Sequence, residues 1–153
     1  MRILYILILY PLFMSCDPQI NYQDEKLKEF FNSQWEQNLK NYPEFATYLG
    51  DSRYNDRLTD MSIEAVNKRH IQTKLSYEEI SAINKAHLST EYKLYYDLYI
   101  DRLKMSIERY QFKEHLVPID QMGGIQINSA NLVDISPFDT YDDYKNYLQR
   151  LIR

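Results

Sequence analysis

The stretch TEYKLYYDLYIDRLKMSIERY, residues 90–110, decides the fold class of this chain. Its aromatic and aliphatic residues recur every three or four positions, which is the period of an α-helix. The sequence predicts that this helix starts at Ser89 or Thr90. Because its apolar stripe is broad, we expect the helix to be buried on more than one side. The stripe consists of Tyr92, Tyr95, Tyr96, Tyr99, Leu103, Ile107 and Tyr110, widened by Leu94, Leu98 and Met105.

A first helix is predicted over residues 24–40. Asp24 and Glu25 lie in its first turn, where negative charge interacts favourably with the helix dipole. Trp35 and the neighbouring Phe pair are expected in the core, since they share the apolar face. That face comprises Leu27, Phe30, Phe31, Gln34, Trp35 and Leu39.

Another helix is predicted to begin at a Ser62 cap and to run to about residue 86. His70 lies on its apolar face, and we interpret it as a satisfied core or seam residue. A bend or break is expected near Leu75 and Ser76, because Ser76 is able to cap a fresh helix with Glu79 three residues later.

Between these helices lies the segment YPEFATYLGDSRYNDRLTDMS, residues 42–62. Pro43 suits the first position of a short helix, and Gly50 suits a left-handed cap after its last turn. The charged stretch that follows, residues 51–60, is expected to run over the surface. Its three aspartates and two arginines indicate a surface ion-pair network rather than a catalytic acid–base pair.

The helical period stops between residues 111 and 138, where Pro118 and Gly123–Gly124 break any helix. The sequence predicts a long loop there, and long loops inside domains are usually functional. Within it lie His115, Asp120 and Gln121. A last helix is predicted after Thr140, with Asp143 in the position of a capping box, and no strand-like alternation persists anywhere. The fold class predicted is all-α.

The N-terminal region is typical of a bacterial lipoprotein signal. Arg2 precedes an uncharged run from Ile3 to Met14, and LFMSC then resembles a lipobox that ends at Cys16. We expect residues 1–15 to be a signal peptide, residues 16–24 a tether, and residues 25–153 the helical domain. Acylation of Cys16 would anchor the protein to a lipid bilayer at the cell envelope, facing the periplasm or the exterior. The alternative is an ordinary secretory signal in which Cys16 is incidental.

Composition excludes several classes of function. The net charge is −4, and no basic block is present, so nucleic acid is not an expected partner. The three histidines are too far apart for a His-x-x-x-His zinc pair, and no Gly-x-Ser-x-Gly nucleophile elbow occurs. With Cys16 assigned to the lipobox, no thiol remains for catalysis. The sequence therefore predicts no catalytic residue, no metal ligand and no cofactor in this chain.

Three blocks resemble a known family in their order and spacing. They are residues 42–62, the run YYDLYIDRLKMSIERYQFKEHLVPIDQMGG, and SPFDTYDDYKNYLQRL. Together they resemble bacterial domain-of-unknown-function family 885 (DUF885), whose complete members carry a His-Glu-x-x-x-x-His element in their C-terminal half. The resemblance implies the helical N-terminal portion of a larger fold similar to gluzincin-type carboxypeptidases. From this resemblance, His115 and Gln121 are candidates for substrate contact.

From this resemblance we expect the N-terminal part of a lipid-anchored, zinc-dependent peptidase-like hydrolase, not catalytic on its own. Zinc is expected only in a full-length relative, where the metal would lower the pKa of a bound water. A peptide is the expected substrate of the complete protein. One alternative is a non-catalytic helical lipoprotein that binds a peptide or protein partner. Another is a degenerate remnant without a stable fold.

Overall fold

The computed structural model describes residues 21–117, 119 and 123–152. The predicted signal peptide and the lipidation site Cys16 lie outside the described residues, as does most of the tether. The described part contains six α-helices and no strand, apart from an isolated bridge between Ile119 and Gly124, so the all-α prediction is confirmed. The helices are α1 Tyr22–Asn41, α2 Pro43–Tyr48, α3 Ile63–Ser81, α4 Thr90–Arg109, α5 Ile125–Ile135 and α6 Tyr141–Ile152.

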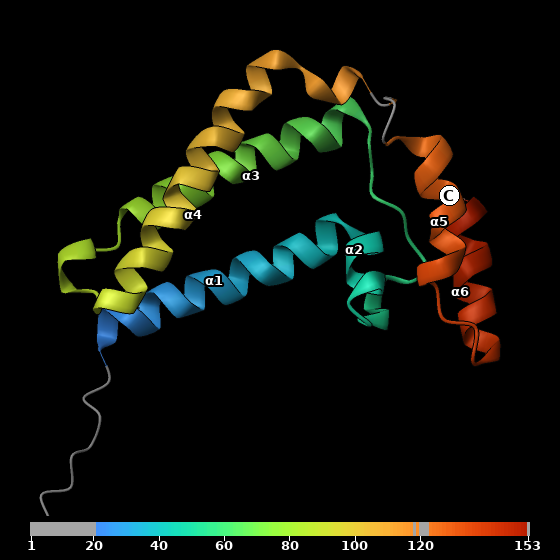
Figure 1. Cartoon of the computed structure of the whole chain (residues 1–153), viewed down its shortest axis with the longest axis horizontal. Helices are drawn as coiled ribbons and strands as arrows, with labels where there is room; N and C mark the ends of the chain where they lie inside the picture. Colours follow the sequence, from blue (N-terminus) through green and yellow to red (C-terminus); the bar gives the residue numbers. More distant parts are fainter. Residues whose placement is uncertain (1–20, 118, 120–122, 153) are drawn as a thin grey trace, which may run out of the picture.

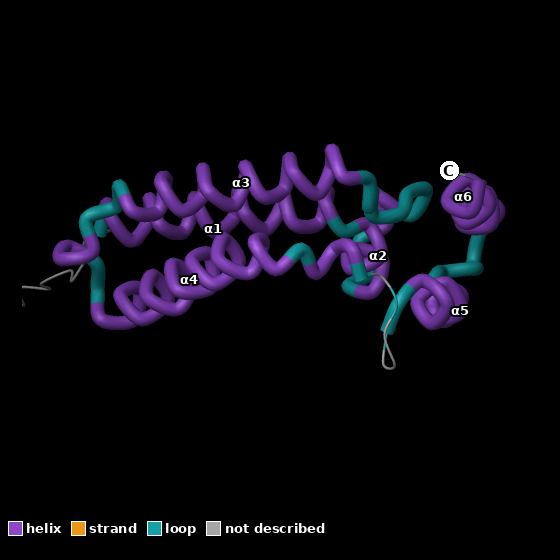
Figure 2. Tube along the Cα trace, turned by 90° about the horizontal axis from the view of Figure 1, so that it is seen from above, coloured by secondary structure: helices purple, strands orange, loops and turns teal. Residues whose placement is uncertain are grey.

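Helices α1, α3 and α4 pack together and hold the main core (Figures 1 and 2). All three approach each other near the start of α1, and α1 then diverges from α3 and α4 toward α2 (Figure 1). Edge-to-face packing of Phe30 on Tyr99, with ring centroids 5.5 Å apart, joins α1 to α4. The buried core consists of Leu27, Phe30, Ile80, Ile83, Leu88, Tyr96 and Leu103.

Local capping explains where the helices start. Asn21 Oδ1 accepts a hydrogen bond from the Gln23 amide at α1, and Ser62 Oγ accepts one from the Ala65 amide at α3. At α6 the predicted capping box is present, because Asp143 Oδ2 lies 2.8 Å from both the amide nitrogen and the hydroxyl of Thr140. These bonds lower the pKa of Asp143.

The predicted break in α3 is wrong, because the helix is continuous through Ser76. Ser76 is buried and its hydroxyl donates to Gln34 Oε1 at 2.8 Å, so it links α3 to α1 instead of capping a new helix. The predicted burial of α4 on more than one side is also wrong. Leu94, Leu98 and Met105 are each more than half exposed, so the described part of the chain leaves their side of α4 uncovered.

The predicted long loop is interrupted by α5, so that prediction is wrong in part. Gly124 precedes the helix with a φ of +127°, a backbone conformation that favours glycine. The following residues are rich in Asn, Ser and β-branched side chains, which favour a helix only weakly. Helix α5 lies beside α2 and α6 (Figure 1), and Leu132 is buried, so tertiary packing stabilises it.

Helix α2 and the turn after it match the predicted pattern. Pro43 stands at the first position of α2, and Gly50 follows the helix with a φ of +82°. The stretch 51–60 runs over the surface, as predicted, with every residue exposed or half-buried except Asn55, which is buried. Its side chain lies 2.8 Å from the Thr47 hydroxyl, so the turn folds back onto α2.

Arg150 fixes α6 against this turn. It is only 1% exposed, and its Nη2 donates to Thr47 Oγ1 at 2.6 Å and to the Tyr54 carbonyl oxygen at 3.1 Å. Because the Thr47 oxygen accepts from Arg150, its single proton is available to Asn55 or to the Pro43 carbonyl oxygen. Burial lowers the pKa of Arg150, and the nearby carboxylates of Glu44 and Asp56 oppose that shift.

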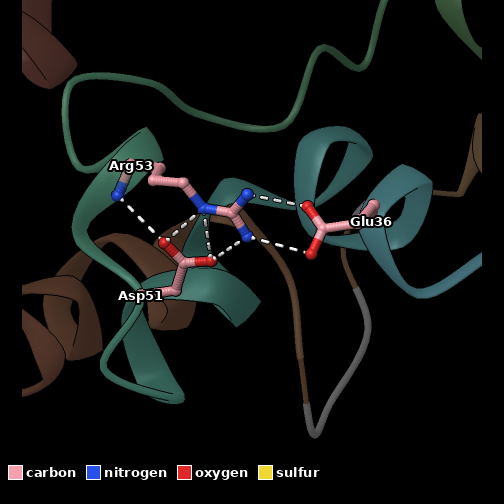
Figure 3. Close-up of polar contacts among 3 residues, drawn as sticks. All are labelled: Glu36, Asp51 and Arg53. Carbon is pink, nitrogen blue, oxygen red and sulfur yellow. Dashed lines mark hydrogen bonds and ion pairs between the residues drawn. The ribbon is translucent and has the colours of Figure 1, made fainter. Parts of the chain in front are cut away.

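A surface ion pair holds the turn to α1. The Arg53 guanidinium contacts the Glu36 carboxylate at 2.7 Å and the Asp51 carboxylate at 2.6 Å (Figure 3). These contacts lower the pKa of Asp51 and raise that of Arg53. The predicted surface ion pairs are therefore present in part: Arg53 pairs with Asp51 and also with Glu36, and Arg57 pairs with Asp56. Asp60 instead accepts a hydrogen bond from the Ser62 amide. Such exposed pairs contribute little to stability, but they favour one placement of α2 beside α1.

No helix in the described part of the chain is both long enough and apolar enough to cross a membrane.

Candidate functional site

A groove of about 540 Å³ lies between α1, α3 and α4, at the end where these helices diverge. Its lining is mixed, with five aromatic side chains, five side-chain amides, three Ser or Thr hydroxyls and two guanidinium groups. Concave sites that combine apolar surface with a few placed polar groups are the usual locations of ligand binding. The lining residues are Phe31, Gln34, Trp35, Gln37, Asn38, Asn41, Tyr42, Phe45, Arg69, Gln72, Thr73, Ser76, Tyr99, Arg102, Leu103 and Ser106.

One face of α1 forms a complete wall of the groove. Its lining residues from Phe31 to Asn41 recur at three- and four-residue spacing, which places them on the same side of the helix. Ten residue steps at about 1.5 Å give this wall a length of about 15 Å. The wall is therefore long enough to contact an extended chain segment rather than a single small group.

Hydrogen bonds connect this wall to α3 across the groove. Gln34 Oε1 accepts from the Ser76 hydroxyl at 2.8 Å, and Asn41 Nδ2 donates to Gln72 Oε1 at 3.2 Å. Each bond uses only part of the amide involved, so the Nε2 groups of Gln34 and Gln72 keep hydrogen-bonding capacity. Gln37 and Asn38 make no side-chain hydrogen bond with other described residues. The groove thus offers several donors and acceptors to a ligand.

The charged groups of the groove are all cationic. Arg69 Nη1 donates to the Asp60 carbonyl oxygen at 2.7 Å, and its guanidinium lies 5.7 Å from the centre of the Tyr42 ring. The guanidinium of Arg102 lies 5.9 Å from the centre of the Tyr99 ring. Burial raises the pKa of Tyr99, and the positive charge of Arg102 opposes that shift. No Asp or Glu is among the described residues that line the groove.

A smaller apolar recess of about 370 Å³ adjoins the groove and is lined by residues of α1 and α4. Tyr95 and Leu98 line it together with Phe31, Tyr99 and Arg102, which also line the groove. Arg102 therefore stands where a polar groove meets an apolar recess.

The predicted position of Trp35 is wrong. It was expected in the core, but it is 49% exposed and lines the groove, with its ring 6.1 Å from that of Phe45. The expectation for the Phe pair is correct for Phe30, which is buried, whereas Phe31 is half-buried and also lines the groove. The helical spacing of these residues is as predicted, but their burial also depends on how closely the facing helices approach α1, which spacing alone does not contain.

The two histidines of the α3–α4 edge stack on one tyrosine. The Tyr110 ring lies 3.7 Å from the His70 ring and 5.6 Å from the His115 ring, and its hydroxyl donates to Asn67 Oδ1. His70 is half-buried, which agrees with the predicted seam position, and burial, helped by the positive charge of Lys74, lowers its pKa.

The structure does not bring His115 to the groove, since His115 is in the short 3-10 turn η4 Glu114–Leu116 against Tyr110. Gln121 lies outside the described residues, as does Cys16. Substrate contact by His115 and Gln121 and lipidation of Cys16 therefore stay predictions. The amides of the α1 wall are the groove residues that the sequence analysis missed. The available signal was the presence of Gln34, Asn38 and Asn41 on an otherwise apolar face.

Among the described residues, no group of three or more His, Cys, Asp or Glu side chains is arranged to hold a metal ion.

Comparison with known proteins identifies the family. Residues 43–153 match the family model described as "Bacterial protein of unknown function (DUF885)". The match includes all three blocks on which the resemblance was based, apart from Tyr42. No curated protein and no solved structure matches the chain. By the family match over most of its length, the chain belongs to the DUF885 family of bacterial proteins of unknown function.

Proposed function

We propose that this chain provides the peptide-binding part of a lipid-anchored, peptidase-like protein of the bacterial cell envelope, and that the groove between α1, α3 and α4 is the binding site. The chain contributes ligand contacts rather than catalytic groups. The zinc-binding element implied by the resemblance to peptidases would come from outside these 153 residues.

The composition of the groove carries this proposal. A peptide backbone presents alternating N–H and C=O groups, and side-chain amides are able to pair with both. Gln34, Asn38 and Gln72 stand along the groove with unused amide capacity, while Trp35 and Phe45 provide flat apolar surface for side chains. A groove with this lining favours an extended polypeptide over a compact apolar molecule.

Trp35 makes the proposal directly testable, because it is the only tryptophan of the chain and it lines the groove. The full chain, purified in detergent, is titrated with a mixture of short blocked peptides while tryptophan fluorescence is followed. A saturable change in emission is expected, and Gln34→Ala together with Asn38→Ala should weaken it. Gln149→Ala, an exposed amide on α6, is the matched control and should leave the titration unchanged. If no peptide changes the Trp35 emission, the groove is not a peptide site.

The envelope anchor requires a separate test. Cells that express the chain are labelled with a radioactive fatty acid, and the Cys16→Ser variant is the control. Label on the wild-type protein and none on the variant is the expected result. An unlabelled wild-type protein would exclude the lipid anchor.

A second candidate is a non-catalytic helical lipoprotein that binds a peptide or protein partner. The observation that favours it is the same groove, which has ligand-binding character without carboxylates or histidines in its lining. The DNA beyond codon 153 distinguishes the two. An open reading frame that encodes a His-Glu-x-x-x-x-His element supports the peptidase-like protein, and a frame without one supports the second candidate.

A further inference from the structure

The arginines of the groove have no carboxylate partner in its lining, although carboxylates are common in this chain. The chain has 22 acidic and 18 basic residues, yet the groove contains two arginines and no acidic residue. Three other arginines of the described part are paired with carboxylates: Arg53 with Glu36 and Asp51, Arg57 with Asp56, and Arg109 with Glu114 at 2.5 Å. The pKa of Asp60 is lowered by hydrogen bonds from Ser62 and by the positive charge of Arg69, so Arg69 has a carboxylate nearby. Arg102 has none among the described residues, and its positive charge is therefore left for a ligand.

Of the two groove arginines, Arg102 is the more available for ligand binding. It makes no hydrogen bond or ion pair with any other described residue, and the Tyr99 ring at 5.9 Å is the contact that its guanidinium makes. Arg69 is held more firmly, by Tyr42 and by the Asp60 carbonyl oxygen. A guanidinium presents a planar set of N–H donors that matches the two oxygens of a carboxylate.

We propose that the groove selects acidic peptides, an inference that rests on the proposed peptide-binding function. Arg102 binds a Glu or Asp side chain of the ligand, and Arg69 adds positive charge from α3 on the facing wall. The amides of α1 pair with the peptide backbone. A bulky apolar residue next to the acidic one enters the recess beside Tyr95 and Leu98, because Arg102 lies between that recess and the groove.

The dimensions of the groove limit the peptide that it holds. The α1 wall is about 15 Å long, and an extended chain advances by about 3.4 Å per residue, so about four or five residues fit. The suitable probes are thus short peptides with both ends blocked, so that the only ligand charge is on a side chain. One peptide has Leu-Glu at its centre, and the other has Leu-Gln, which has nearly the same shape and no charge.

Both peptides are titrated into the full chain in detergent, with Trp35 fluorescence as the readout. The Leu-Glu peptide is expected to bind about 10-fold more tightly than the Leu-Gln peptide, which is the effect of one partly exposed charged hydrogen-bond pair. Arg102→Gln should remove this preference, and Arg102→Lys should restore part of it. Lys104→Gln, which removes one charge from the same helix outside the groove, should preserve it.

Each outcome has a distinct meaning. Equal binding of the two peptides to the wild-type chain, or a preference that survives in Arg102→Gln, overturns the selection of acidic peptides while the peptide site itself stands. Absence of any response to either peptide overturns the proposed function as well. Because Arg102 is exposed and unpaired among the described residues, the variant is expected to fold, and its circular dichroism spectrum checks this.

Discussion

Replacement of Arg150 by alanine tests how α6 is held in the fold. The side chain is almost completely buried, and its Nη2 makes hydrogen bonds of 2.6 Å to Thr47 Oγ1 and 3.1 Å to the Tyr54 carbonyl oxygen. A hydrogen bond from a charged donor contributes about 1.5–3 kcal/mol, and the two bonds share one nitrogen. The variant also leaves a cavity and two unpaired acceptors, whereas it removes the cost of burying a charge. We therefore expect a loss of about 3 kcal/mol.

Amide hydrogen exchange is the suitable assay because it resolves individual helices. A loss of about 3 kcal/mol corresponds to about 100-fold faster exchange of the α6 amides. The amides of α1, α3 and α4 should change much less, since the hydrogen bonds of Arg150 to other described residues go to α2 and the turn after it, and Arg150 is not part of the core between those three helices. Arg150→Met, which keeps most of the volume but not the donors, should lose less than the alanine variant.

Lys145→Ala is the matched control, because it removes one positive charge from an exposed position of the same helix. It should change the stability of α6 by less than about 0.5 kcal/mol. If Arg150→Ala changes the stability of α6 as little as Lys145→Ala does, the buried arginine does not hold α6, and its hydrogen bond to Thr47 does not stabilise the fold.

Two further predictions concern pH and backbone strain. Because the pKa of His70 is lowered by burial and by Lys74, the unfolded chain binds a proton there more readily, so the free energy of unfolding should decrease as the pH falls below about 6.5. Urea denaturation at about pH 7.5 and about pH 5.5 should show a smaller decrease in the free energy of unfolding for His70→Phe, which keeps a ring against Tyr110. An equal decrease in the wild type and the variant would contradict the assignment of this pH dependence to His70. Gly50→Ala should destabilise the chain by about 1 kcal/mol, because a φ of +82° is unfavourable with a Cβ although nothing lies within 4 Å of it. Urea denaturation should show a smaller loss of stability for Gly50→Asn than for Gly50→Ala, because Asn adopts a positive φ more readily. An unaltered urea midpoint for Gly50→Ala would show that the positive φ at Gly50 causes no strain.

The helix starts were predictable because their causes are local. Ser62 and the Thr140–Asp143 pair bond to backbone or side-chain groups within three residues, so spacing alone reveals them. The same holds for Pro43 and Gly50 around α2. Helix α5 was missed because its residues have weak helix propensity, and its stability depends on neighbours distant in sequence.

The groove and the α6 contact could not be predicted because both depend on distant residues. Arg150 and Thr47 are separated by 103 positions, and no local pattern connects them. The periodicity of α1 correctly placed Phe31, Gln34 and Trp35 on one face, although it did not identify Asn38 as part of that face. Whether that face meets a neighbour closely or lines an open groove depends on the angle between helices, which periodicity does not contain.

The central claim is that ligands bind between α1, α3 and α4, and photo-crosslinking tests it most directly. A blocked acidic peptide that carries a benzophenone group is irradiated with the full chain, and the attachment sites are mapped by mass spectrometry. We expect crosslinks within residues 31–42, 69–76 and 99–106, and excess unlabelled peptide should reduce them. Crosslinks that cluster instead on the exposed face around Leu94, on α6, or evenly over the surface would contradict the claim.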